Sequence, residues 1–127
     1  MRDCRMAKFR KDTRTGLTHK FVIHDPKEPC EGFIVANYEQ ETGAFEVFIH
    51  MDYSDESLRG MARSLCLIVS VAVQNNAPLS VIVDKLKHQR YSPSGCTEHP
   101  QIQITSSLSD YIAKWIDLNF LKQGVKL

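Results

Sequence analysis

The sequence predicts an α+β protein in which a small antiparallel sheet of about three strands packs against a long buried helix, a short helix and a C-terminal helix. Two observations carry this prediction. Up to residue 51, stretches in which apolar residues alternate with polar ones are typical of strands. From residue 54 onward, apolar residues recur at the three- and four-residue spacing of helices.

Length and composition indicate one soluble globular domain. The chain has 127 residues, of which 43% are hydrophobic and 24% charged, and its net charge is +1. A nearly neutral chain does not attract nucleic acid as a whole, so we do not expect a nucleic-acid partner. No apolar run approaches the roughly 20 residues that cross a bilayer, and the first residues lack the apolar region of a signal peptide. We therefore expect no membrane association and a cytoplasmic location.

Residues 1–16 form a basic stretch without apolar periodicity. We predict a basic N-terminal arm over 1–16, followed by a single domain over 17–127. A solvated tail is the expected role of this arm, and contact with phosphates is the alternative. The charged residues of the arm are Arg2, Arg5, Lys8, Arg10, Lys11 and Arg14 against Asp3 and Asp12.

Three strands are predicted after the arm. Residues 17–24 alternate with period two, and the prolines at 26 and 29 end this strand because proline lacks a backbone donor. Residues 32–37 and 44–51 lie on either side of a polar turn that contains Gly43, which is typical of a hairpin with a longer loop.

A long helix is predicted to begin at Ser54, Asp55 and Glu56, which supply a capping side chain and acid for the first turn. From Leu58 to Val73 the apolar residues cover most of the helix circumference, so we expect burial on more than one side. The sheet can cover one side. A second protomer would cover another, and we therefore expect a homo-oligomer, a dimer or higher.

Two shorter helices complete the chain. Pro78 opens a helix that continues to Leu86, since proline is favoured in the first helical turn. Residues 102–104 alternate and predict a short extended piece. Ser106 or Ser107 then caps a final helix, which Gly124 stops.

The segment from 85 to 100, KLKHQRYSPSGCTEHP, carries the strongest functional signal. Its Pro-Ser-Gly centre can be neither helix nor central strand, so we expect a polar loop with hydroxyls and free backbone amides. Together with Lys85, Lys87 and Arg90, such a loop suits an anion such as phosphate. The alternative is a solvated helix C-terminus, where basic residues complement the dipole.

Catalytic and metal signatures are weak. No Gly-rich phosphate loop, GxSxG, HExxH or paired-carboxylate pattern occurs, which favours binding over catalysis. Cys96 and His99 have the spacing of zinc ligands, but a site would need two more, such as His24 and Cys30, or His88. Cys96 with a histidine could also form a nucleophile and base. We expect no metal, no cofactor and no enzyme activity.

From Thr18 onward the chain resembles the TSCPD-type domain near the C-terminus of adenosylcobalamin-dependent ribonucleotide reductases. The distinctive run is K-x-x-H-x-R-aromatic-x-P-S-G, from Lys85 to Gly95. The name-giving Thr-Ser-Cys-Pro-Asp motif is not present, and the nearest stretch is TSSLSD, residues 105–110. Further matching pieces are Thr18-His19-Lys20-Phe21, Glu31-Gly32-Phe33, Glu46-Val47-Phe48-Ile49, Leu58-Arg59-Gly60-Met61, Ser70-Val71-Ala72-Val73, Ala77-Pro78-Leu79, Pro100-Gln101-Ile102 and Asp110-Tyr111-Ile112 with Trp115.

The resemblance implies a module related to these reductases, without the barrel that carries their radical chemistry, cobalamin contacts and redox cysteines. We therefore predict a non-catalytic nucleotide-binding protein with a pocket between protomers. By similarity of type to small phage proteins, it would sequester a nucleotide, including cyclic or phage-defence signalling nucleotides. The alternative is an accessory or detached subunit of an adenosylcobalamin-dependent ribonucleotide reductase, with the reductase catalytic chain as its partner.

The predicted ligand site lies on the 85–100 segment and on the long helix. Arg59 and Arg63 share a helix face and could reach the ligand, although pairing with acids is the alternative. His88 and Arg90 have a further alternative, which is to hold the loop in shape by bonding its carbonyls. The expected roles are phosphate contacts for Lys85, His88 and Arg90, base stacking for Tyr91, and completion of an anion nest by Ser92, Ser94 and the Gly95 amide.

Overall fold

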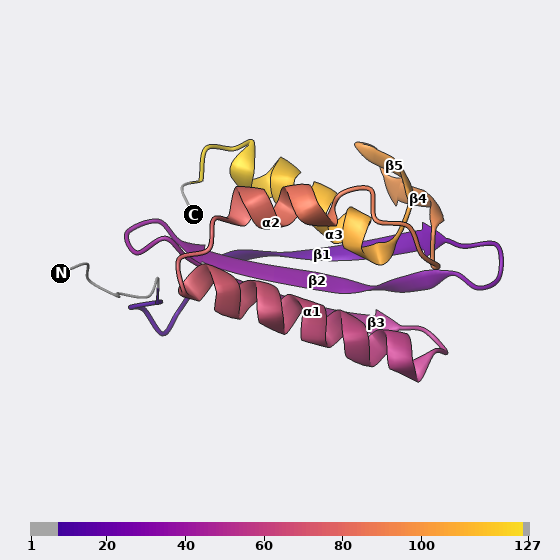
Figure 1. The fold of residues 1–127 in the computed structure, drawn as a ribbon, viewed down its shortest axis with the longest axis horizontal. Coiled ribbons are helices and arrows are strands. Elements are labelled where there is room, and N and C mark those ends of the chain that lie inside the picture. Colours follow the sequence, from indigo (N-terminus) through magenta and orange to yellow (C-terminus); the bar gives the residue numbers. More distant parts are fainter. Residues whose placement is uncertain (1–7, 126–127) are drawn as a thin grey trace.

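The computed structural model describes residues 8–125, which form a two-layer α+β fold with a five-stranded antiparallel sheet (Figure 1). The strand order is β3-β2-β1-β4-β5. The elements are β1 (Thr15–His24), β2 (Cys30–Glu39), β3 (Ala44–Asp52), α1 (Glu56–Gln74), α2 (Leu79–Leu86), β4 (Gly95–His99), β5 (Ile102–Thr105), α3 (Leu108–Ile116) and η1 (Asp117–Leu121), a π-helical turn.

The α+β class, the three strands and the three helices are confirmed, but the prediction of about three strands is too low. β4 occupies part of the segment that was predicted as a loop, and β5 confirms the extended piece at 102–104. Gly95 explains the difference, because its φ of 142° is open to glycine and an added Cβ would lie 2.6 Å from the His24 carbonyl oxygen. This close approach lets β4 pair with the end of β1 directly after the Pro-Ser-Gly turn.

The hydrophobic core lies between the sheet and the helices. α3 is the most deeply embedded helix, because it packs against α2, β5 and η1 as well as under β1. Its Tyr111 and Trp115 are each at most 2% exposed. The largest fully buried side chains are Trp115, Tyr111, Phe21, Phe45, Phe120, Ile23, Ile34, Leu79, Leu108, Ile112, Ile116 and Val47.

Helix α1 lies along β3, the strand at one end of the sheet. The predicted start is confirmed, since the Asp55 side chain caps the helix by accepting a hydrogen bond from the Leu58 nitrogen at 3.2 Å. The buried hydroxyl of Ser70 accepts a hydrogen bond from the Val47 nitrogen at 2.9 Å and lies 2.9 Å from the Cys66 carbonyl oxygen. The Ser70 side chain of α1 therefore satisfies the backbone N–H of Val47 in the terminal strand β3.

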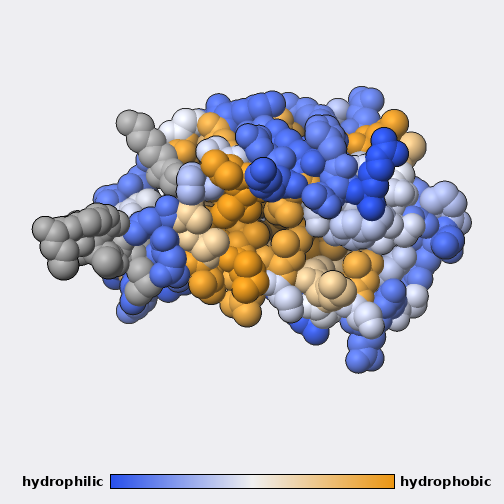
Figure 2. Space-filling view, in the orientation of Figure 1, coloured by the Kyte–Doolittle hydropathy of each residue, from blue (hydrophilic) through white to orange (hydrophobic). Residues whose placement is uncertain are grey.

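The outward face of α1 is apolar and exposed. Met61 is 71% exposed, Ile68 62% and Leu67 60%, and residues 64–74 include no charged side chain. Figure 2 shows a continuous hydrophobic surface over this helix and toward α2. Within one chain, α1 is thus buried on the sheet side only, and cover by a second protomer stays a prediction.

The sequence left two serines, Ser106 and Ser107, as candidates for the cap of α3. Ser107 is the cap, and its hydroxyl accepts a hydrogen bond from the Asp110 nitrogen at 3.0 Å. The helix continues into the π-helical turn, and Gly124 follows in the left-handed region with φ of 79°. This confirms the predicted stop, because a glycine tolerates positive φ at a helix end.

Candidate ligand-binding site

The 85–100 segment is held in place by a buried carboxylate. One oxygen of Asp110 accepts a hydrogen bond from the His88 nitrogen at 2.7 Å. Its other oxygen accepts from the Thr105 hydroxyl at 2.8 Å and the Ser106 nitrogen at 3.2 Å, and lies 2.9 Å from the Lys114 ammonium. The His88 N–H reaches Asp110 at a sharp backbone turn directly after α2, where His88 adopts a left-handed φ of 67°.

The charge state of Asp110 reflects these bonds. Burial would raise the pKa of this fully enclosed carboxyl, but the hydrogen bonds from His88, Lys114, Thr105 and Ser106 outweigh burial and lower its pKa to about 2. Asp110 is therefore ionised at neutral pH and acts as an anion inside the protein.

A second carboxylate, Asp25 in the turn after β1, binds the other end of the segment. It accepts hydrogen bonds from the nitrogens of Ser94 and Lys27, each at 2.9 Å. The backbone bond from Lys27 and then the bond from Ser94 lower the pKa of Asp25. Two amides of the segment, those of His88 and Ser94, are thus already bonded to carboxylates of this chain.

The predicted ligand-binding residues of the segment point to different places. His88 lines a hollow of about 250 Å³ with Lys87, Lys114 and Asp117, whereas Ser94 and Gly95 lie against the end of β1. Both Lys85 and Arg90 are exposed, and no described residue pairs with either charged group. Arg90 therefore does not tie the carbonyls of the segment together, a role that the two aspartates fill through the amides.

Tyr91 faces a groove on the side of α1. The groove holds about 300 Å³ and is lined by Leu58, Met61, Ala62 and Leu65 of α1, by Tyr91 and by Ser109. The hydroxyl of Tyr91 lies 2.6 Å from the Ser109 hydroxyl and accepts a hydrogen bond from the Ser109 nitrogen at 2.9 Å. The ring is thereby fixed with one side open, and 38% of Tyr91 is exposed. Such a surface can receive a flat apolar or aromatic group.

The two arginines of α1 lie away from this groove. Arg59 donates a hydrogen bond to the backbone carbonyl of Tyr53, in the turn between β3 and α1. Arg63 is exposed and follows Arg59 by four residues, so both side chains share one helix face. At 100° per residue, that face lies on the other flank of the buried stripe from Met61 and Leu65. The structure does not bring these arginines together with Tyr91 in one chain.

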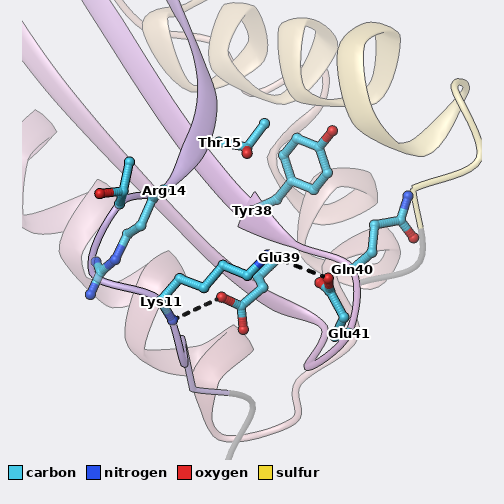
Figure 3. A pocket seen from close by; sticks show the side chains of 8 residues that line it. Lys11, Arg14, Thr15, Tyr38, Glu39, Gln40 and Glu41 are labelled. Atoms are coloured by element: carbon cyan, nitrogen blue, oxygen red, sulfur yellow. Dashed lines mark hydrogen bonds and ion pairs between the residues drawn. The ribbon is translucent and has the colours of Figure 1, made fainter.

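The described part of the N-terminal arm, residues 8–14, binds acidic residues of β2 and β3. Glu39 accepts hydrogen bonds from the nitrogens of Arg10 and Lys11 at 3.0 and 3.1 Å, and Arg14 forms an ion pair with Glu46 at 2.7 Å. Figure 3 shows the Lys11 ammonium directed toward Glu41, across a hollow of about 200 Å³. Acidic partners offset the charge of these arm residues, and residues 1–7 lie outside the described part.

The segment also carries Cys96 and His99, the residues of the metal and nucleophile alternatives. Across residues 8–125, no group of three or more His, Cys, Asp or Glu side chains is arranged to hold a metal ion. Cys96 is exposed, and no hydrogen bond joins it to a histidine in the same range. Burial raises the pKa of Cys30 to about 12, so this thiol is protonated at neutral pH.

Sequence reasoning missed Asp110 and Asp25 as the residues that organise the segment. Asp110 carries a usable signal, because Ser107-x-x-Asp110 has the spacing of a capping box and indicates a helix N-terminus. No sequence signal links Asp110 to His88, which lies 22 residues earlier.

These features define a class, a small two-layer α+β domain that presents an apolar groove beside a cationic segment. The sequence model of the TSCPD domain matches residues 5–120. The chain therefore belongs to the TSCPD domain family, which confirms the resemblance. The match begins inside the stretch predicted as an arm.

The relatives are long enzymes that contain this domain as a small part. A vitamin B12-dependent ribonucleotide reductase of Rhodopirellula baltica is 36% identical over 110 residues, which is 87% of this chain and 10% of the relative. The same enzyme of Streptantibioticus cattleyicolor is 33% identical over 85% of this chain and 17% of the relative. That of Bradyrhizobium diazoefficiens is 25% identical over 88% of this chain and 9% of the relative.

The chain thus spans between about a tenth and a sixth of the length of these curated relatives. No solved structure matches it significantly. In the described range, 8–125, no helix is long and apolar enough to cross a membrane.

Proposed function

We propose that this chain is a non-catalytic nucleotide-binding protein of the TSCPD family, acting in the cytoplasm. The observation that carries the proposal is the Tyr91 groove, whose aromatic ring belongs to the same segment as the cations Lys85 and Arg90. Tyr91 offers a fixed, half-open ring, and Lys85 and Arg90 are exposed with no partner among the described residues. A nucleotide would use both features, because its base stacks on an aromatic ring and its phosphates take charge-assisted hydrogen bonds from cations.

A second copy of the chain completes the proposed site. The groove is open, and one wall is α1, whose outer face is apolar and without charge over residues 64–74. Pairing α1 with its counterpart in another protomer would bury Met61 and Ile68 and cover the groove, because exposed apolar patches of this kind mark protein contacts. Arg59 and Arg63 would then act from the partner protomer.

Sequestration is the role that follows from binding without catalysis. A protein that holds a nucleotide and has no group to transform it lowers the free concentration of that nucleotide. Cyclic and phage-defence signalling nucleotides are ligands for which this effect would matter, and they belong in the test.

The proposal is tested on the purified protein. The protein is denatured, the released small molecules are identified by mass spectrometry, and a panel of linear and cyclic nucleotides is titrated by calorimetry. We expect a co-purifying nucleotide or a submicromolar Kd. Arg90→Ala should raise the Kd about tenfold or more, while the exposed cation Lys27 gives a matched control, Lys27→Ala, that should bind normally. A blank across the whole panel would overturn the proposal.

The family relationship favours a second candidate, an accessory or detached subunit of an adenosylcobalamin-dependent ribonucleotide reductase. The relatives carry this domain within a vitamin B12-dependent ribonucleotide reductase, and the exposed face of α1 is a surface that a larger chain could cover. The expected result is a stable complex with a reductase catalytic chain in size-exclusion chromatography, lost on Ile68→Glu. Failure to form a complex with such a chain would exclude this candidate.

A further inference from the structure

A second pocket lies between β1 and the turn from β4 to β5, and it shares no lining residue with the Tyr91 groove. It holds about 360 Å³. Residues from both faces of β1 line it: His19 from the helix side, and Lys20 and Val22 from the other side. Since neighbouring residues of a strand point to opposite faces, a pocket lined by both must open along the edge of the strand. The remaining lining residues are Glu98, His99, Pro100 and Tyr111.

The pocket exists because β4 pairs with only the last two residues of β1. The register joins Ile23 to Thr97 and His24 to Cys96, and β4 is irregular between Cys96 and His99. Toward β4, the backbone of residues 15–22 has no strand partner in the described range. Unpaired strand edges present both N–H donors and C=O acceptors. The pocket mouth therefore offers hydrogen bonds of both kinds.

Aromatic rings form the inner wall. The His19 ring is stacked on those of Trp115 and Tyr111, with centroid distances of 5.5 and 6.0 Å, and His99 meets His19 edge-on at 5.4 Å. A hydrogen bond of 2.8 Å between His19 Nε2 and the Tyr111 hydroxyl fixes the His19 ring. These flat and edge-on surfaces are set before any ligand arrives, which lowers the entropy lost on binding.

The two histidines are neutral donors or acceptors at pH 7 rather than cations. Burial lowers the pKa of His99, and burial together with repulsion from His99 lowers that of His19. His99 Nδ1 accepts a hydrogen bond from the Gln101 nitrogen at 3.0 Å, so its proton is on Nε2. No described residue takes that proton. The acidic Glu98 lies 3.0 Å from His24. Lys20 is the one lysine or arginine among the described lining residues.

We propose that this pocket binds a neutral, planar nitrogen heterocycle of the nucleobase type, independently of the Tyr91 groove. The ring would pack against the half-exposed imidazoles of His19 and His99, which the buried Tyr111 and Trp115 hold in place, and its polar rim would bond to His99 Nε2–H and to the open backbone edge of β1. The volume lies near the lower end of the range for small-ligand pockets, roughly 300–1,000 Å³. A polyphosphate is not matched, since only Lys20 would face its charge.

The test follows the imidazole Cε1–H signals of the five histidines by NMR while adenosine, inosine, cytidine or uridine is added. We expect saturable shifts at His19 and His99 for at least one nucleoside and none at His50, which lies on the uncovered face of the sheet. His99→Phe keeps an aromatic ring but removes the donor, and should raise the Kd about tenfold. His99→Ala should do the same, and His50→Ala is the matched control.

Three results would overturn the proposal. One is no shift at either histidine with any nucleoside at millimolar concentration. Another is binding of inorganic phosphate or of nucleotides but not of nucleosides, which would make the pocket an anion site. The third is an unchanged Kd in both His99 variants. Arg90→Ala should leave these shifts intact, so this test stands apart from that of the Tyr91 groove.

Discussion

The carboxylate of Asp110 accepts a hydrogen bond from the backbone nitrogen of His88 at 2.7 Å, across 22 residues of sequence. The same carboxylate also bonds to Thr105 at the end of β5, to Ser106 directly after it and to Lys114 in α3. One buried anion therefore fixes the exit of α2, the end of β5 and the start of α3 relative to each other.

Asp110→Asn should destabilise the fold. The substitution keeps the shape of the side chain but replaces an anion with an amide, so the Lys114 ammonium loses its partner and one oxygen acceptor becomes a donor. We expect a loss of about 2–4 kcal/mol in the free energy of unfolding, measured by urea denaturation. Asp84→Asn, on the exposed side of α2, is the control and should change stability by less than about 0.5 kcal/mol. Equal stability of the two variants would contradict this role.

Acid should unfold the protein in part through Asp110. The pKa of this carboxyl is about 2 in the folded protein and has a reference value of 3.8. Because the folded pKa is the lower one, the contribution is fully present above about pH 4 and is lost as the pH falls toward 2. Wild-type stability should drop more steeply than that of Asp110→Asn over this window. Parallel curves from pH 5 to 2 would show that Asp110 does not contribute.

Two substitutions of Tyr91 separate its ring from its hydroxyl. Tyr91→Phe removes the bonds to Ser109 and should cost about 1 kcal/mol of stability, while the retained ring should leave the nucleotide Kd within about twofold. Tyr91→Ala also removes the stacking surface and should raise the Kd about tenfold or more. Calorimetry and urea denaturation measure both effects. Equal Kd values for the wild type and Tyr91→Ala would exclude the ring from the ligand site.

Placing a charge on the outer face of α1 should separate the protomers. Ile68 is 62% exposed, and Ile68→Glu would bury an unpaired carboxylate in a helix–helix contact. We expect light scattering coupled to size exclusion to show an oligomer for the wild type and a monomer for this variant. Ile104, 68% exposed on β5, supplies the control Ile104→Glu, which should stay oligomeric. A monomeric wild type would refute the prediction.

Local patterns were sufficient to predict most of the fold. Alternation over 17–24 and the apolar spacing from Leu58 to Val73 are properties of single elements, so they are visible in the sequence. β4 was missed because a strand that starts at a glycine after Pro-Ser is defined by its pairing with the end of β1 and with β5. That pairing depends on contacts between distant residues.

The site was harder to predict because side-chain direction depends on backbone turns and on partners far along the chain. The cations and Tyr91 cluster in sequence, but the left-handed turn at His88 sends neighbouring side chains to different sides. Two backbone amides of the segment, those of His88 and Ser94, are bonded to Asp110 and Asp25 and are therefore not open to a ligand. Composition marks the segment as unusual, but only the fold shows which of its side chains and amides remain free to bind a ligand.

The bond between Ser70 and Val47 affects how copies of this protein can associate. β3 ends the sheet, and a terminal strand with free backbone groups invites further strands to add, which leads to polymerisation. The Ser70 hydroxyl occupies the Val47 N–H in the middle of that strand, and the adjoining helix shields it. Addition of a further strand at this position is thereby hindered, so we expect copies that associate on this side to do so through side-chain packing between helices rather than through a continuous sheet.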